Sequence, residues 1–508
     1  MFRPASLFRS GAVLCRRKPI RVFGEGEDGY TVDVTLLSAE DDLLAQSSCD
    51  PVDGRFEAVL APQEARTGCT LLISAGPCGE YEYEDISIGD VYLAGGQSNM
   101  AMELAGAAGG KEEIAAHDDP QLRFFNIPRY ARAGEEQRNA LRETRWHPVR
   151  PGEGGDDSAA AYFFAAALRR GEPDVPVGII GCNWGGTSVT CWTDEETLRE
   201  TAEGARYLED YAALSAGKSM EAYLAEEAAF DAAMADWNER ANRRRAEHPG
   251  DTWPQTVAAV GPCPWNPPVG PGSPFRPGAL TAPMLDCAAP MTLTGVLFYQ
   301  GEEDAARTQK YDVLLTGMIR CWRRKFRDPR LPFLLVQLPM WLDDGAEDSF
   351  LWPALRLAQA AVRDSVSDTG LVCLLDQGEY GNIHPLEKRA VGERLYALAE
   401  RMIYGRGGAV SPRAVYMWAD RGTEHLCQMV HVRMSEPVRV PDGEEPLLLE
   451  LAGADGVFFP ARGMIEGSVL HIVSEKVFSP VHARYAWTDY GRVNITGAGG
   501  LPLEPFAF

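Results

Sequence analysis

The sequence lacks the features that mark membrane proteins, secreted proteins and proteins stabilised by metals or disulfides. No stretch approaches the roughly 20 consecutive apolar residues that span a bilayer. The start, from Met1 to Pro4, opens no apolar run as long as that of a secretory signal. The 11 cysteines are scattered without a CxxC pair, which disfavours a disulfide framework and a zinc site. We therefore expect reduced thiols and a cytoplasmic location.

Basic residues are too few to support binding to polyanions. The chain of 508 residues carries 49 Lys and Arg against 73 Asp and Glu, a formal net charge of −24. Such a surface repels a phosphate backbone and an acidic membrane, so we expect neither as a partner. No internal repeat is visible, and the oligomeric state is left open. The length suggests about three domains.

The first and last parts of the chain have the pattern of β-sheet. Short alternating runs such as Tyr30 to Leu36 lie between Gly, Asp and Pro turns, which predicts a small β-sandwich-like domain over residues 1–88. Strand-like segments such as Pro446 to Leu451 return after about Gly405. These predict a second β domain over residues 405–508.

The middle of the chain alternates between strands and helices. Continuous apolar runs suit strands of a parallel sheet covered on both faces, and helical stretches lie between them. We therefore predict a doubly wound α/β domain over residues 89–404. A segment at about 195–275, first rich in Ala, Glu and Arg and then in Pro and Gly, predicts a helical insertion and an irregular loop. The apolar runs are 91–94, 177–181, 295–299, 333–337 and 371–375.

Polar clusters follow three of these runs, where an open α/β sheet binds its ligands. Ser98 lies in a glycine-flanked turn after the first run, Glu302 to Asp304 follow the third, and His384 follows the fifth. Serine suits a nucleophile and histidine a general base. Each cluster also has a structural interpretation: a turn, a solvated helix start, or a histidine satisfied in the core.

Together the clusters resemble the sialate O-acetylesterase family of SGNH hydrolases, which is related to carbohydrate acetylesterases. The resemblance covers nearly the whole chain, and four blocks occur in the family's order, each after a strand. The blocks are 89–100, containing Gly-Gly-Gln-Ser-Asn-Met; 184–192, containing Trp-Gly-Gly-Thr; 299–302, Tyr-Gln-Gly-Glu; and 376–388, containing Asp-Gln-Gly-Glu and Ile-His-Pro.

The resemblance implies a role for each matching residue. Ser98 would be the nucleophile and His384 its base. The backbone N–H of Ser98, that of Gly186 and the side chain of Gln300 would form the oxyanion hole. Asn99, Trp192 and Glu302 are candidate substrate-binding residues. The family needs no metal or organic cofactor, so we expect none.

The sequence departs from the family at the partner of the histidine. Many relatives have Asp two residues before His384, whereas this chain has Asn382, and an amide does not stabilise an imidazolium as a carboxylate does. Asp376 and Glu379 are candidates for the third member of the triad. A backbone carbonyl that orients His384 is the other alternative.

The resulting hypothesis is a serine esterase that removes O-acetyl groups from a small or oligomeric carbohydrate, with O-acetylated sialic acid as the preferred substrate. The first alternative is an acetylesterase for xylan or another plant glycan. The second is a non-catalytic carbohydrate-binding protein on a hydrolase scaffold. Retention of both Ser98 and His384 favours an enzyme. Sugar selectivity would come from surrounding loops, including the Pro-rich stretch around Trp265.

Overall fold

A computed structural model describes residues 2–248, 250–307, 310–420 and 428–508. Its centre is a mainly parallel sheet in the order β10-β9-β11-β8-β12-β13-β14. The predicted α/β class is confirmed, with one difference: β10 runs antiparallel to β9, so the sheet is mixed. The strands are β8 (Glu80–Gly96), β9 (Asp119–Asn126), β10 (His147–Val149), β11 (Val177–Asn183), β12 (Gly295–Tyr299), β13 (Phe333–Val336) and β14 (Thr369–Val372).

Two pairs of helices pack around this sheet. Helix α4 (Ala159–Gly171) packs against α12 (Arg389–Met402), and α10 (Tyr311–Lys325) packs against α11 (Leu351–Ser365). Helix α4 is buried over its first ten residues, which are mostly alanine and aromatic, and Ser158 caps its start by accepting a hydrogen bond from Ala161 N. Small side chains allow such close packing of a helix within the core.

The N-terminal sheets are continuous with the core. Strand β8 pairs antiparallel with β7 (Arg66–Ser74) through its first half and enters the parallel sheet through its second half. The exposed, alternating half and the fully buried half therefore belong to one strand, which crosses position 88. The remaining strands here are β1 (Arg3–Pro4), β2 (Val13–Cys15), β3 (Ile20–Glu25), β4 (Val32–Leu37), β5 (Leu43–Cys49) and β6 (Arg55–Leu60).

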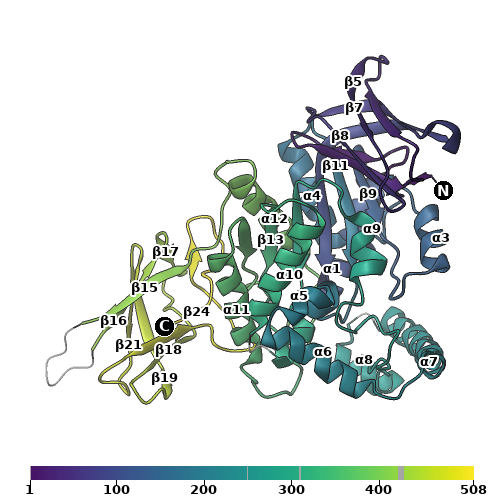
Figure 1. The fold of residues 1–508 in the computed structure, drawn as a ribbon. Helices are drawn as coiled ribbons and strands as arrows, with labels where there is room; N and C mark the ends of the chain where they lie inside the picture. The colour runs from purple at the N-terminus through teal and green to yellow at the C-terminus, as the bar shows by residue number, and fades with distance from the viewer. Residues whose placement is uncertain (1, 249, 308–309, 421–427) are drawn as a thin grey trace.

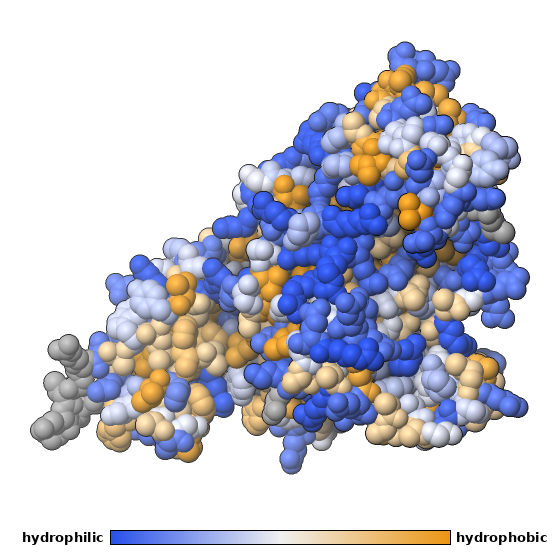
Figure 2. Space-filling view, viewed as in Figure 1, coloured by the Kyte–Doolittle hydropathy of each residue, from blue (hydrophilic) through white to orange (hydrophobic). Residues whose placement is uncertain are grey.

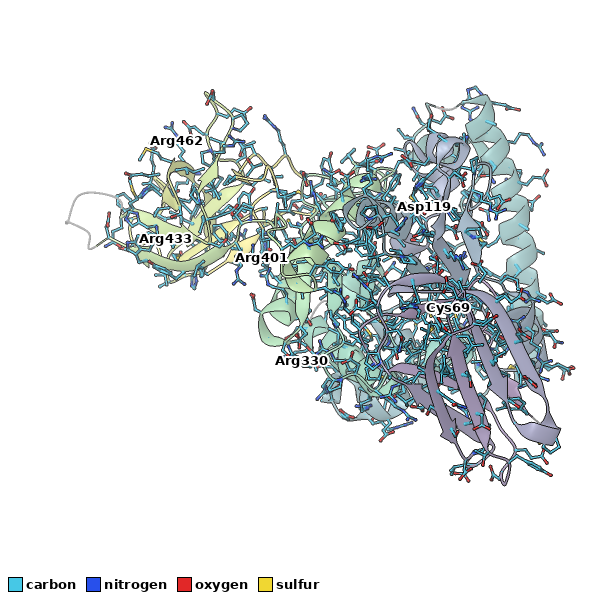
Figure 3. All side chains as sticks on the ribbon, turned by 90° about the horizontal axis from the view of Figure 1, so that it is seen from above. Cys69, Asp119, Arg330, Arg401, Arg433 and Arg462 are labelled. Carbon is cyan, nitrogen blue, oxygen red and sulfur yellow. The ribbon has the colours of Figure 1, made fainter. Side chains whose placement is uncertain are left out.

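The C-terminal sheets form a separate body at the opposite end of the molecule (Figures 1 and 3). They enclose a second hydrophobic core, which reaches the α/β region through Met340, Cys373 and Leu375. The sheets are β15 (Ala414–Ala419), β16 (Val430–Met434), β21 (Val469–Val473) and β20 (Arg462–Glu466); β19 (Phe458–Pro460), β18 (Leu449–Ala452), β22 (His482–Tyr485) and β24 (Phe506–Ala507); and β17 (Val438–Arg439) with β23 (Thr496–Gly497).

Four helices follow β11 and project from the lower edge of the core in Figure 1: α5 (Glu195–Arg199), α6 (Ala202–Leu214), α7 (Met220–Glu247) and α8 (Trp253–Val260). Helix α7 is long and mostly exposed, and it buries only Tyr223, Trp237 and Ala241. Figure 2 shows mostly hydrophilic residues over the helices in the middle of this face, as the charge of the chain requires. No helix in the described ranges is both long and apolar enough to cross a membrane.

Candidate active site

The residues that follow three neighbouring strands lie together at one edge of the sheet. Gly96, the last residue of β8, is in register with Asn183 of β11 and Tyr299 of β12. Gly96 has φ +135°, and a Cβ there would lie 2.1 Å from the Tyr299 carbonyl oxygen, so only glycine permits this close approach. Directly beyond it the short helix α1 (Ser98–Ala101) begins.

Ser98 and His384 are brought together at this edge. Ser98 is the first residue of α1, and His384 lies in the loop between β14 and α12. His384 Nε2 is 2.8 Å from Ser98 Oγ, which is hydrogen-bond distance for a nucleophile and its base. Burial and the nearby Lys388 ammonium lower the pKa of His384 to about 4, so the imidazole is neutral at pH 7 and able to accept a proton.

The other ring nitrogen of His384 is not hydrogen-bonded to any of the residues that the structure describes. Asp376 instead forms a bidentate ion pair with Arg394, at 2.6 and 2.7 Å. Glu379 accepts from Asn382 Nδ2 at 2.7 Å and from Leu386 N at 2.7 Å. Neither predicted carboxylate therefore contacts the imidazole, because each is engaged by a partner of its own.

Backbone donors surround the serine. The N–H groups of Ser98, Gly185 and Gly186 make no hydrogen bond within the described ranges, so they are available to a developing oxyanion. A Cβ on Gly185 would lie 3.4 Å from Ser98 Cβ, which places this residue against the nucleophile. Gly186 has φ +70° and faces Trp265, where a Cβ would approach the indole ring to 2.6 Å. A side chain at either glycine would narrow the site.

A cavity of about 900 Å³ opens from the Ser98–His384 pair towards the helical insertion. Its wall is largely aromatic: Trp184 and Phe275 come from loops of the core, and Phe230 and Trp237 come from α7. Trp265 is 47% exposed and packs edge-to-face against both Phe230 and Phe275. Such rings offer flat, rigid faces for a sugar, with Ser98 at the base of the cavity.

Comparisons with known proteins relate the chain to carbohydrate esterases. A family described as "Carbohydrate esterase, sialic acid-specific acetylesterase" matches residues 281–379. Sialate O-acetylesterase of Mus musculus is 24% identical over 82% of this chain and 77% of its own length, and that of Homo sapiens is 23% identical over 86% and 78%. The crystal structure of a carbohydrate acetylesterase from Xanthomonas citri covers 100% of this chain and 99% of its own, with 26% identity and a TM-score of 0.75.

The chain is thus similar to sialate O-acetylesterases and to a carbohydrate acetylesterase over most of its length. The predicted enzyme class, a carboxylic ester hydrolase, is confirmed by these similarities. The rest of its site differs in several details from what the sequence led us to expect.

In this esterase the Gln300 side chain lies beneath the site. Its Nε2 is within hydrogen-bond distance of Gln97 Oε1 and Thr187 O, both at 3.1 Å, and of Asp304 Oδ2 at 2.6 Å. The amide has two protons for these three acceptors. To donate to an oxyanion it would have to leave one of them. The buried Asp304 carboxylate is the acceptor that draws Nε2 away from the serine.

The side-chain amide that lines the cavity belongs to Gln97, not to Gln300. Its Oε1 accepts from Gln300 Nε2, Gly301 N and Glu303 N, which fixes the carboxamide. Its Nε2 donates to no acceptor in the parts of the chain described. No role was predicted for Gln97 from the sequence, although it immediately precedes the serine in the first family block.

Trp192 and Asn99 are buried and do not line the cavity, contrary to expectation. The Trp192 indole is fully buried, donates to Thr187 Oγ1 at 2.9 Å and packs against Trp322. A ring enclosed in the core has no face to stack on a sugar. Asn99 is also fully buried, with both ends of its amide bonded inside the protein. Glu302 does line the cavity, although it is only 9% exposed.

Charged groups of the cavity include two arginines in contrasting states. Arg132 is neutralised by a bidentate ion pair with Glu227, at 3.0 and 3.1 Å. Arg129 is in no ion pair with a described residue: its Nε and one Nη donate to Asn183 O and Oδ1 at 3.0 and 3.1 Å. Arg129 is exposed, and partial desolvation in the cavity lowers its pKa, but an arginine remains charged. A lone arginine in a loop gave no signal in the sequence.

Glu303 is another ionisable group on the wall of the cavity. Burial and the neighbouring Asp304 raise its pKa to about 7. Its charge therefore changes near neutral pH.

Proposed function

We propose that this esterase removes acetyl groups from O-acetylated sialic acid through an acetyl-enzyme intermediate on Ser98. The observation that carries the mechanism is the 2.8 Å contact between Ser98 Oγ and the His384 imidazole at the base of the cavity. The lowered pKa of His384 keeps the imidazole unprotonated at pH 7, which is the state a base must have to accept the serine proton.

The steps follow from the positions of these groups. Ser98 Oγ attacks the acetyl carbonyl while His384 Nε2 takes the hydroxyl proton. The backbone N–H groups of Ser98 and the Gly185–Gly186 pair, with the free amide of Gln97, receive the negative oxygen. His384 returns the proton to the departing sugar hydroxyl. Water then repeats the sequence and releases acetate and free Ser98.

Arg129 supports an anionic sugar over a neutral one. Its Nε edge is occupied by Asn183, which holds the guanidinium plane in place and leaves the end-on pair of N–H groups unused. That fork matches a carboxylate, which sialic acid carries and xylan backbones lack. The relatives named sialate O-acetylesterase support the same choice.

The test is acetate release from O-acetylated sialic acid and from acetylated xylo-oligosaccharides under the same conditions. We expect kcat/KM for the sialic acid ester to be higher by about tenfold or more, the value of a charge-assisted hydrogen bond. Higher kcat/KM for the xylo-oligosaccharides would favour the plant-glycan alternative. Failure to hydrolyse either sugar or a chromogenic acetate ester would favour the carbohydrate-binding alternative.

A further inference from the structure

The backbone on both sides of His384 is held by buried side chains. Asn99 Nδ2 donates to the carbonyl oxygen of Ile383 at 3.0 Å, and Lys388 Nζ donates to that of Pro385 at 2.6 Å. Asn382 Oδ1 accepts from the backbone N–H of His384 at 3.1 Å. The peptide of the catalytic histidine is therefore fixed at three points, whereas its ring is hydrogen-bonded to Ser98 alone among the described residues.

Asn99 connects the two catalytic residues. It follows Ser98 directly in the chain, and it bonds to Ile383, which directly precedes His384. Asn99 Oδ1 also accepts from Lys388 Nζ at 2.8 Å, so the two side chains that hold the histidine loop are bonded to one another. A shift of the Asn99 amide would thus move the serine and the histidine relative to each other.

Opposite charges fix the orientation of this amide. Its oxygen faces the Lys388 ammonium, and its NH₂ group contacts the Glu302 carboxylate. A flipped amide would place like partial charges against both ions, so only one orientation is stable. The second Glu302 oxygen is buried without a hydrogen bond to any described residue. Burial raises the pKa of this carboxyl, and the Asn99 hydrogen bond and the Lys388 charge oppose that rise.

We propose that Asn99 and Lys388, with Glu302 behind them, are positioning residues that hold His384 through its backbone. They supply the orientation that a carboxylate on the second ring nitrogen supplies in a Ser-His-Asp triad. This inference rests on the proposed Ser98–His384 mechanism. It explains how the histidine is aligned although Asp376 and Glu379 are engaged elsewhere.

The test compares Asn99→Ala and Lys388→Met with the wild type on one chromogenic acetate ester. Because misplacement by about 1 Å costs on the order of a hundredfold, we expect kcat to fall by about that factor with KM nearly unchanged. Asn494→Ala is the matched control: Asn494 is a buried asparagine that bridges Leu447, Glu444 and Glu445 in the C-terminal region. It should lower the melting temperature without a change in kcat.

The pH profile separates positioning from a loss of structure. The charged groups that act on Lys388 are Glu302, Glu379 and Glu387, and Lys388 in turn lowers the pKa of His384. Removing the ammonium should therefore move the acid limb of kcat/KM to higher pH. A merely destabilised enzyme would lose activity evenly across pH, with the limb in place.

Three results would overturn the inference: near wild-type kcat in either variant, an unmoved acid limb in Lys388→Met, or an equal loss of kcat in Asn494→Ala. Asn99→Asp, which keeps the shape of the side chain but replaces the donor with a carboxylate oxygen facing Glu302, replaces Asn99→Ala if that variant does not fold. Ser98→Ala is measured in parallel. If this variant stays active, the proposed mechanism fails. If it is inactive while the Asn99 and Lys388 variants have normal activity, only the present inference fails.

Discussion

The base of the cavity and its outer wall are built on different principles. At the base, Ser98 and His384 lie among buried groups whose hydrogen bonds tie β8, β12 and the histidine loop together. On the wall, α7 is mostly exposed and contributes rings such as Phe230. A rigid base suits a reaction that every acetyl ester shares. Changes in a separate wall can alter which sugar binds without disturbing the chemistry. Variants at the base should therefore affect all substrates, and variants on the wall only some.

The largest effect is expected from the nucleophile. Ser98→Ala should lower kcat by about 10⁴-fold or more on every acetyl ester, because removal of a catalytic serine abolishes the covalent route. The measurement is steady-state hydrolysis with thermal melting as a check of the fold. A loss of kcat that differs from one sugar ester to another would contradict the distinction between base and wall.

Arg129→Gln should act on charged sugars alone. We expect kcat/KM to fall about tenfold to a hundredfold for O-acetylated sialic acid, since a charge-assisted pair is lost, and to stay unchanged for a neutral acetate ester. Arg132→Gln is the matched control, because Arg132 lies in the same cavity but is already paired with Glu227. Equal losses on both substrates would show that Arg129 is structural.

Trp265→Ala should raise KM for sugar esters by about tenfold through loss of an aromatic face, while the small chromogenic acetate keeps its KM. Tyr416→Ala serves as the control, since Tyr416 is an exposed aromatic residue of the C-terminal region. An unchanged KM for every sugar ester would place the binding surface elsewhere on the wall.

The smallest effects concern the two carboxylates that do not contact the imidazole. Asp376→Asn and Glu379→Gln should each change kcat by no more than a few-fold, far below the factor of about 10⁴ seen when a triad aspartate becomes an amide. Glu379→Gln should have the larger effect of the two, because Glu379 supports Asn382. A loss of about a hundredfold in one variant, at unchanged stability, would identify it as a triad member.

A pH profile tests the environment of the base. His384 must be neutral to accept the serine proton, and its pKa is lowered to about 4. Activity should therefore be lost only as the pH falls towards 4, below the limb of an ordinary histidine with a pKa near 6.5. A limb between pH 6 and 7 would show that the imidazole is more exposed to water or closer to a carboxylate than the structure indicates.

The sequence predicted the parts of this esterase that depend on local pattern. Apolar runs were sufficient to predict the parallel sheet, and the family resemblance of the Gly, Ser and His blocks implied the pairing of Ser98 with His384. The environment of Gln300 was not predictable, because it depends on Asp304 turning into the same buried space. The burial of Trp192 could not be predicted either, because the sequence around a single tryptophan near glycines does not show which face the indole packs against. The role proposed for Arg129 could not be predicted from the sequence, because only the structure shows that no acid is paired with it in the described ranges.

Detection of the acetyl-enzyme tests the central claim most directly. The protein is mixed with a chromogenic acetate ester, quenched in acid within the first turnover and digested for mass spectrometry. The account predicts the added mass of one acetyl group on the peptide that contains Ser98, absent in Ser98→Ala and formed far more slowly in His384→Ala. An acetyl group on another residue, or rapid acetate release by Ser98→Ala, would contradict it.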